Sequence, residues 1–135
     1  MARVTVVNDN PDFLELVRDI LEDDRFDTVT IDGDRDDALE AISASRPDVL
    51  MIDLRMGSDE LHGWDVAQRV RANAEFTGLP VLLCSADVGA LKKLEADLDD
   101  WRDVATLVKP FGVDELTATL DHLLAEAASG RRSPA

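Results

Sequence analysis

The feature that most restricts the fold of this chain is a fivefold alternation of short apolar runs and longer amphipathic segments. The apolar runs lie at residues 4–7, 26–31, 49–54, 81–84 and 106–108. Between them, apolar residues recur with the three- and four-residue spacing of helices that bury one face. Strands separated by such segments are joined by right-handed helical crossovers. The pattern therefore predicts an α/β domain in which helices cover both faces of a parallel sheet.

The run at residues 49–54 is the most continuously apolar, as expected for a central strand covered on both faces. Among doubly wound sheets, the strand order 2-1-3-4-5 places the first and third strands side by side where the winding reverses. We therefore expect a doubly wound five-stranded parallel sheet of this order, the flavodoxin-like (βα)5 fold. The predicted helices cover residues 11–23, 34–45, 64–72, 91–98 and 113–124, and the inward face of the first comprises Phe13, Leu16, Val17, Ile20 and Leu21.

Polar residues at the ends of four apolar runs mark the edge where a site would form. Asp9 follows the first run, Asp53 lies at the end of the third, and Lys109 follows the fifth. Because parallel strands end at one edge of a sheet, two carboxylates and an ammonium group are expected in a single crevice. Ser85, which follows the fourth run, adds a hydroxyl group to this edge.

These side chains suit phosphoryl transfer. Two close carboxylates repel each other and favour a hard cation with oxygen ligands, for which Mg²⁺ is the natural choice. With Lys109 as a second positive charge, Asp53 can act as a nucleophile toward phosphorus and become an aspartyl phosphate. Ser85 can donate a hydrogen bond to a phosphate oxygen, and the small Ala86 leaves room for the group.

At these positions the chain resembles the receiver domains of two-component response regulators, of the stand-alone, CheY-like kind. The resemblance covers residues 3–127, and its motifs are Val6-Val7-Asn8-Asp9, Ile52-Asp53-Leu54-Arg55-Met56, Ser85-Ala86 and Lys109-Pro110-Phe111. It implies that Asp53 accepts a phosphoryl group from a histidine kinase or phosphotransfer protein, with Lys109 binding the phosphate and Ser85 as the switch hydroxyl. It also implies a Mg²⁺ site made by Asp9, Asp53 and the backbone carbonyl of Arg55, and a cis Lys109–Pro110 peptide bond.

Three positions depart from the usual receiver pattern. Asn8 replaces one of two acids, which we expect to weaken Mg²⁺ binding without abolishing it, Asn8 itself contributing only weakly and through water. Gly57 stands where a proline is common and predicts a mobile loop. Thr106 takes the place of an aromatic residue that turns inward behind the switch hydroxyl. We therefore expect the effect of phosphorylation to be transmitted by a different route, through the fourth helix and Trp101.

The composition restricts which classes of partner and which cellular location are expected. The formal net charge of −15 repels phosphate backbones and anionic lipids, so neither nucleic acid nor a membrane is expected as a partner. The single cysteine, Cys84, lies in an apolar run and is expected to be a buried hydrophobe, which favours a reducing, cytoplasmic location. Residues 1–128 are predicted to form one receiver domain and residues 129–135 a disordered tail, with no output domain. The fourth helix, fifth strand and fifth helix would then face a downstream protein.

Two contact hypotheses follow from the resemblance. Arg55 and Asp87 are expected to flank the mouth of the crevice, where a pair between them would shield the aspartyl phosphate from water. Leu14 and Phe111 are candidates either for contact with the kinase or for the margin of the core. His62 is expected to be an ordinary surface residue of a loop.

Two other functions remain as alternatives. A pseudo-receiver would keep the fold as a protein-binding module without phosphorylation, and Asn8 and Thr106 favour this interpretation. A phosphatase of the haloacid dehalogenase type would pass through an aspartyl phosphate but needs a second acid where Arg55 stands. We therefore expect a phosphoacceptor that takes part in its own Mg²⁺-dependent phosphorylation and dephosphorylation, and not an enzyme in the usual sense.

Overall fold

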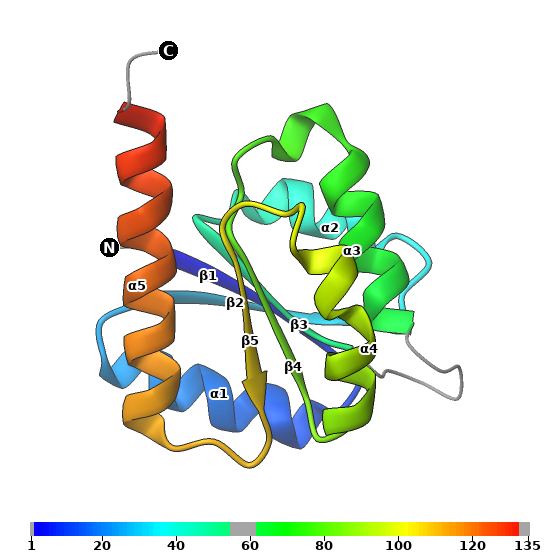
Figure 1. The fold of residues 1–135 in the computed structure, drawn as a ribbon. Coiled ribbons are helices and arrows are strands. Elements are labelled where there is room, and N and C mark those ends of the chain that lie inside the picture. The colour runs from blue at the N-terminus through cyan, green and yellow to red at the C-terminus, as the bar shows by residue number, and fades with distance from the viewer. Residues whose placement is uncertain (1, 55–61, 133–135) are drawn as a thin grey trace.

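The structure, a computed structural model, describes residues 2–54 and 62–132. Five parallel strands form one sheet in the order β2-β1-β3-β4-β5 (Figure 1), which confirms the predicted doubly wound, flavodoxin-like fold. The strands are β1 (Arg3–Asn8), β2 (Asp27–Asp32), β3 (Val49–Asp53), β4 (Val81–Ser85) and β5 (Val104–Val108). The helices are α1 (Pro11–Asp23), α2 (Ala38–Ser45), α3 (His62–Ala72), α4 (Val88–Leu98) and α5 (Val113–Arg132), with a short 3-10 helix, η1 (Ala74–Phe76).

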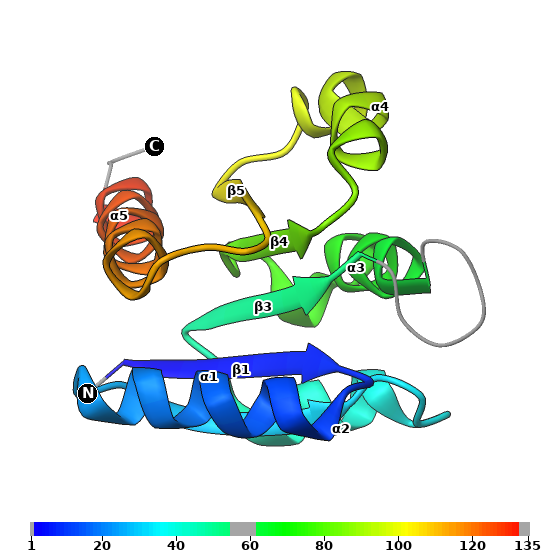
Figure 2. The ribbon, with the colours of Figure 1, turned by 90° about the horizontal axis from the view of Figure 1, so that it is seen from below.

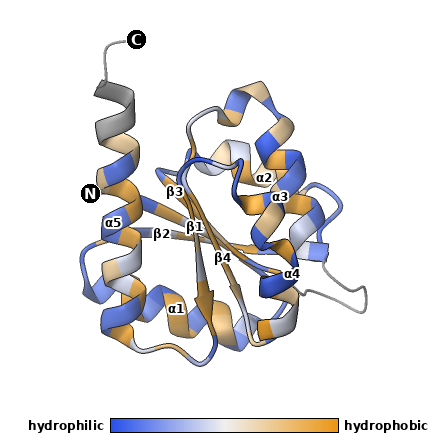
Figure 3. Cartoon of the chain, in the orientation of Figure 1, coloured by the Kyte–Doolittle hydropathy of each residue, from blue (hydrophilic) through white to orange (hydrophobic). Residues whose placement is uncertain are grey.

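Each face of the sheet carries its own hydrophobic core. Ile52 of β3 belongs to the core beneath α2, α3 and α4, whereas its neighbour Met51 belongs to the core beneath α1 and α5. Figure 2 shows α4 and α5 on opposite sides of β4 and β5. All five residues of β3 are buried, as expected for a central strand, and this strand carries mainly hydrophobic colours in Figure 3. Across the described residues, no helix combines the length and apolarity that spanning a bilayer requires.

Helix α1 begins and ends where the sequence predicts, but one residue of its predicted inward face is exposed. Pro11 occupies the first turn, and the Asn10 side chain caps the helix. Val17 and Leu21 are fully buried, whereas Leu16 is 58% exposed. Successive helical residues are about 100° apart, so the buried stripe centred on Val17 and Leu21 leaves Leu16 at its edge. The prediction that Leu16 faces the sheet was therefore wrong.

The ends of other elements also differ from the sequence prediction. Helix α2 begins at Ala38, because residues 34–37 form turns in which Arg35 pairs with Asp37. Helix α4 begins earlier than its apolar residues suggested, since Asp87 caps its first turn. Helix α5 continues to Arg132, past Leu124, the last apolar residue of the predicted helix.

Candidate functional site

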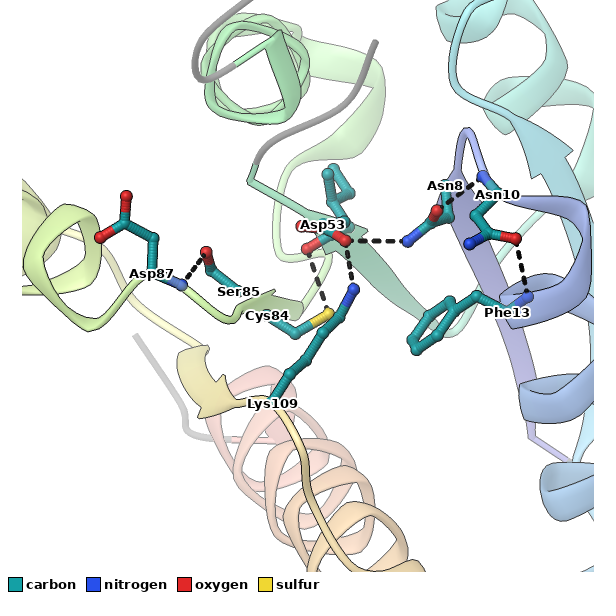
Figure 4. A network of polar contacts seen from close by, with 9 residues as sticks. Asn8, Asn10, Phe13, Asp53, Cys84, Ser85, Asp87 and Lys109 are labelled. Atoms are coloured by element: carbon teal, nitrogen blue, oxygen red, sulfur yellow. Dashed lines mark hydrogen bonds and ion pairs between the residues drawn. The ribbon is translucent and has the colours of Figure 1, made fainter.

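The candidate site lies at the carboxyl edge of the sheet. Asn8 ends β1 and Asp53 ends the neighbouring β3, while Ser85 ends β4 on the other side of β3. Lys109 directly follows β5. Figure 4 shows the side chains of Asn8 and Lys109 pointing toward Asp53 from two different directions. The strand order therefore makes Asp53 the centre of the group.

Asp53 is a buried acid with charged and neutral hydrogen-bond partners. Only 8% of the residue is exposed. Its Oδ2 accepts a hydrogen bond from Asn8 Nδ2 over 3.0 Å and contacts the Lys109 ammonium group. Because a buried carboxylate is costly unless it is paired, these two contacts help to stabilise Asp53 in its buried position.

Lys109 is held in place by its backbone and by an aromatic ring. Its backbone N–H donates to the Ser85 carbonyl oxygen over 3.0 Å, and the Lys109–Pro110 peptide bond is cis, as the resemblance implied. Its Nζ lies 4.1 Å from the centre of the Phe13 ring, which favours a cation on its face. Phe13 in turn meets Phe111 edge to face, with ring centres 6.4 Å apart. The sequence had not suggested that Phe13 would support this lysine.

Ser85 lies in the same pocket, and its hydroxyl group is hydrogen-bonded to the backbone of Asp87. The residue is 1% exposed, and its Oγ accepts a hydrogen bond from the backbone N–H of Asp87 over 2.9 Å. Asp87 caps α4 through the N–H of Ala90, so Ser85 lies directly before the start of this helix. The residues that line the open pocket are Asp53, Ser85, Ala86, Asp87, Val88 and Lys109.

The donor set fits a hard divalent cation. Asp9 directly follows β1 and is half-buried, and Asp53 ends the next strand, so two carboxylates lie on adjacent strands. Mg²⁺ typically binds one or two carboxylates and keeps several waters. Within residues 2–54 and 62–132, no group of three or more His, Cys, Asp or Glu residues is placed to hold a metal ion. Asn8 Oδ1 already accepts a hydrogen bond from the Asn10 N–H over 2.8 Å.

Gly63, at the start of α3, belongs to the site although sequence reasoning did not single it out. Its N–H donates to the Leu54 carbonyl oxygen over 2.9 Å. A β-carbon at this position would lie 1.7 Å from the backbone oxygen of Asp53. Only glycine permits this approach of α3 to the end of β3. A glycine at a predicted helix start was the only available signal, and by itself it is not specific.

Cys84 confirms its expected character as a buried, unreactive thiol. It is fully buried, and its Sγ lies 3.6 Å from the Ile52 carbonyl oxygen. Burial raises the pKa of the Cys84 thiol to about 12, the Asp53 carboxylate adds to this increase, and Lys109 opposes it. Because the thiolate is the nucleophilic form, a thiol that keeps its proton at neutral pH is a poor nucleophile.

The structure accounts for some of the remaining predicted residues but not for all of them. Thr106, which stands in place of an aromatic residue, is exposed on β5. His62 differs from the expectation of an ordinary loop residue, since it begins α3, is half-buried and lies 3.1 Å from the Gly33 carbonyl oxygen. Leu14 and Phe111 pack partly buried against the core beneath α1 and α5. The predictions for Arg55, Met56 and Gly57, including the carbonyl ligand and the pair with Asp87, lie outside the described residues.

Comparison with known proteins identifies the class. The family model of the response regulator receiver domain matches residues 4–121, and the chain belongs to this family. It is 34% identical over 119 residues to the DNA-binding response regulator MtrA of Mycolicibacterium smegmatis, an alignment that covers 86% of this chain and 47% of that protein. It is 33% identical over 131 residues to the sensor histidine kinase TmoS of Ectopseudomonas mendocina, covering 95% of this chain and 12% of that one. The chain thus spans about half or less of these relatives.

Solved structures agree with this assignment. The Vibrio cholerae chemotaxis protein CheY4 superposes with a TM-score of 0.76 at 27% identity, covering 91% of this chain and 98% of that one. The response regulator TrrA of Thermotoga maritima, solved in complex with Mg²⁺ and BeF, gives a TM-score of 0.72 at 26% identity, with coverage of 91% and 99%. The recognised receiver family and its two-component context are therefore confirmed, and Mg²⁺ binding in the active site is typical of this family.

Proposed function

We propose that this receiver is a phosphorylation-controlled switch in which Asp53 accepts a phosphoryl group from a histidine kinase or phosphotransfer protein. The observation that carries the proposal is the contact between the buried Asp53 carboxylate and the Lys109 ammonium group, in a pocket that Ser85 also lines. A carboxylate that served only as a helix cap would not need a lysine brought to it from β5. The pairing of a nucleophile with a fixed cation suits phosphoryl transfer.

In the proposed transfer, an oxygen of Asp53 forms a bond to phosphorus while the bond between phosphorus and the donor imidazole nitrogen breaks. The electron pair of the broken bond stays on that nitrogen, which takes up a proton. Lys109 balances negative charge on the phosphoryl oxygens. Ser85, whose Oγ accepts a hydrogen bond from Asp87, retains its own O–H to donate to a phosphoryl oxygen.

Asp9, Asp53 and the backbone carbonyl of Arg55 are the proposed Mg²⁺ ligands, with a weak contribution from Asn8 through water. When bound, the ion would supply a second positive charge beside the phosphoryl group. The Mg²⁺ in the complex of the Thermotoga maritima relative supports this part of the proposal. The single pocket acid next to Asn8 implies weaker Mg²⁺ binding than two acids would give.

Intact mass spectrometry tests the phosphoacceptor directly. The protein is incubated with Mg²⁺ and a small-molecule phosphodonor, and its mass is compared with that of Asp53→Asn treated in the same way. The expected result is the gain of one phosphoryl group in the wild type and none in the variant. An equal mass gain in both proteins would show that a residue other than Asp53 is the acceptor. Loss of the added phosphoryl group on mild alkaline treatment would identify it as an acyl phosphate.

A phosphorylation-independent protein-binding module is the second candidate. Asn8 favours it, because this position lacks the acid that would strengthen a metal site, and exposed Thr106 removes the usual aromatic coupling. The same experiment separates the two functions. No mass gain in the wild type, at any Mg²⁺ concentration, would support the pseudo-receiver.

The remaining parts of the proposal concern partners and setting. The kinase or phosphotransfer protein would approach near Leu14 and Phe111, and a downstream protein would bind the face formed by α4, β5 and α5. The net charge of −15 supports partners other than nucleic acid or membranes. A cytoplasmic location remains our prediction.

A further inference from the structure

Asn8 contacts the proposed phosphoacceptor directly. The residue is 2% exposed, and its Nδ2 donates to Asp53 Oδ2 over 3.0 Å. At the other end of the amide, Oδ1 accepts a hydrogen bond from the Asn10 N–H over 2.8 Å. The opposite orientation would set the amide oxygen against a carboxylate and the amide NH₂ against an N–H. The two partners therefore determine which end of Asn8 faces Asp53.

The start of α1 holds Asn8 in this orientation. Asn10, whose N–H bonds to Asn8, uses its own side chain to cap the helix at Asp12 and Phe13. The Lys109 ammonium group lies over the face of the Phe13 ring. Turning the Asn8 amide toward a metal ion would break its bonds to both Asn10 and Asp53. The start of α1 thus supports both groups that contact Asp53 Oδ2, the Asn8 amide and the Lys109 ammonium group.

We propose that Asn8 is a positioning residue for the phosphoacceptor and that, in this role, its amide is not a direct ligand of the metal ion. With Lys109, it holds the Asp53 carboxylate in one orientation before a phosphodonor arrives, and such positioning lowers the barrier to transfer. An aspartate at residue 8 would instead add a third carboxylate beside Asp9 and Asp53, and the three would repel one another. This inference rests on the proposed function of Asp53 and specifies how that site is organised.

The first test separates metal binding from positioning. The rate of phosphorylation by a small phosphodonor is measured against Mg²⁺ concentration for the wild type, Asn8→Asp and Asn8→Ala. We expect Asn8→Asp to need less Mg²⁺ for half-saturation and yet to have a maximal rate about tenfold lower, because a hydrogen bond to a charged group is lost. Asn8→Ala should lower the maximal rate without tightening Mg²⁺ binding. A maximal rate in Asn8→Asp that equals or exceeds the wild type would overturn the proposal.

The second test needs no phosphorylation. In a ¹H–¹⁵N NMR spectrum of the metal-free protein, the Asn8 side-chain amide signals are identified by their absence in Asn8→Asp. A hydrogen bond to a buried carboxylate should shift one amide proton downfield and slow its exchange. Asp53→Ala should remove both effects, whereas Ser85→Ala, which changes the same pocket without touching Asn8, should leave them. Mg²⁺ should leave the downfield proton in place.

Each outcome of the second test bears on Asn8 alone. Amide signals that are unaffected by Asp53→Ala would refute the contact, and signals that move to the positions of a free amide on Mg²⁺ addition would assign Asn8 to the metal. The backbone spectrum of each variant reports whether the fold is intact. If the wild type accepts no phosphate while the amide signals behave as expected, the proposed function fails and the positioning of Asp53 by Asn8 stands.

Discussion

At the scale of single residues, the site depends on how closely the start of α3 approaches the end of β3. Gly63 donates its N–H to the Leu54 carbonyl oxygen, and its α-carbon faces the backbone oxygen of Asp53. A β-carbon there would lie 1.7 Å from that oxygen, far inside any tolerated contact. The obstacle is backbone and not a flexible side chain, so either α3 or the end of β3 would have to shift.

We therefore predict that Gly63→Ala lowers the free energy of unfolding by about 3 kcal/mol or more, because the added methyl group overpacks a buried backbone contact. Urea unfolding measures this change. Gly112→Ala is the matched control, since a β-carbon at Gly112 meets nothing within 4 Å, and its effect should stay within about 0.5 kcal/mol. Equal unfolding midpoints for the two variants would contradict the prediction.

At the scale of elements, two tryptophans connect α3 to the segment between α4 and β5. Trp64 and Trp101 stack with ring centres 5.0 Å apart and planes 17° from parallel. Arg71 lies 5.4 Å from the centre of the Trp101 ring and donates to the Asp100 carbonyl oxygen over 3.3 Å. The pair packs against the core beneath α2, α3 and α4. Trp101 is therefore a packing residue that is also close to the face predicted for downstream contacts.

These are the only two tryptophans in the chain, so their coupling can be measured without interference. We expect Trp101→Leu and Trp64→Leu to cause the same loss of near-ultraviolet circular dichroism, because a stack needs both rings. In a double-mutant cycle of urea unfolding, the pair should show a coupling of about 0.5–1.5 kcal/mol. Additive losses of stability, or a near-ultraviolet signal that survives either single substitution, would show that the rings do not interact in solution.

At the scale of the whole molecule, the two cores on either side of the sheet shield the central strands from water. Cys84 of β4 lies in the core beneath α1 and α5, and this burial raises the pKa of its thiol to about 12. In the unfolded chain the same thiol titrates near its ordinary value of 9.0. As the pH rises above that value, the unfolded state loses the proton and the folded state keeps it. Stability must therefore fall as the pH rises from about 9 toward 12.

This linkage predicts a slope of up to about 1.4 kcal/mol per pH unit from Cys84 alone. Urea unfolding between pH 8.5 and 10.5 should show a steeper loss of stability for the wild type than for Cys84→Ala. The variant serves as the reference, because lysines and other groups that titrate in this range are common to both proteins. Parallel pH profiles would mean that the thiol is not protected from ionisation in the folded state.

Much of the fold could be predicted because its determinants are local and repeated. The apolar runs gave the strands, the helical spacing gave the crossovers, and the handedness rule left few strand orders. The ends of elements were harder, since they depend on single contacts. Asp87 caps α4 and thereby sets its first residue. Helix α5 continues to Arg132, although its apolar spacing ends at Leu124.

By itself, the sequence determined that polar residues would gather at one edge of the sheet, because parallel strands all end there. It therefore indicated Asp53, Lys109 and Ser85 together. Only the tertiary structure decided which groups touch: the direction of the Asn8 amide, the Phe13 ring beneath Lys109 and the approach of Gly63 to Asp53. Such contacts join segments far apart in the chain, and their geometry depends on how whole elements pack, which no local pattern of residues encodes.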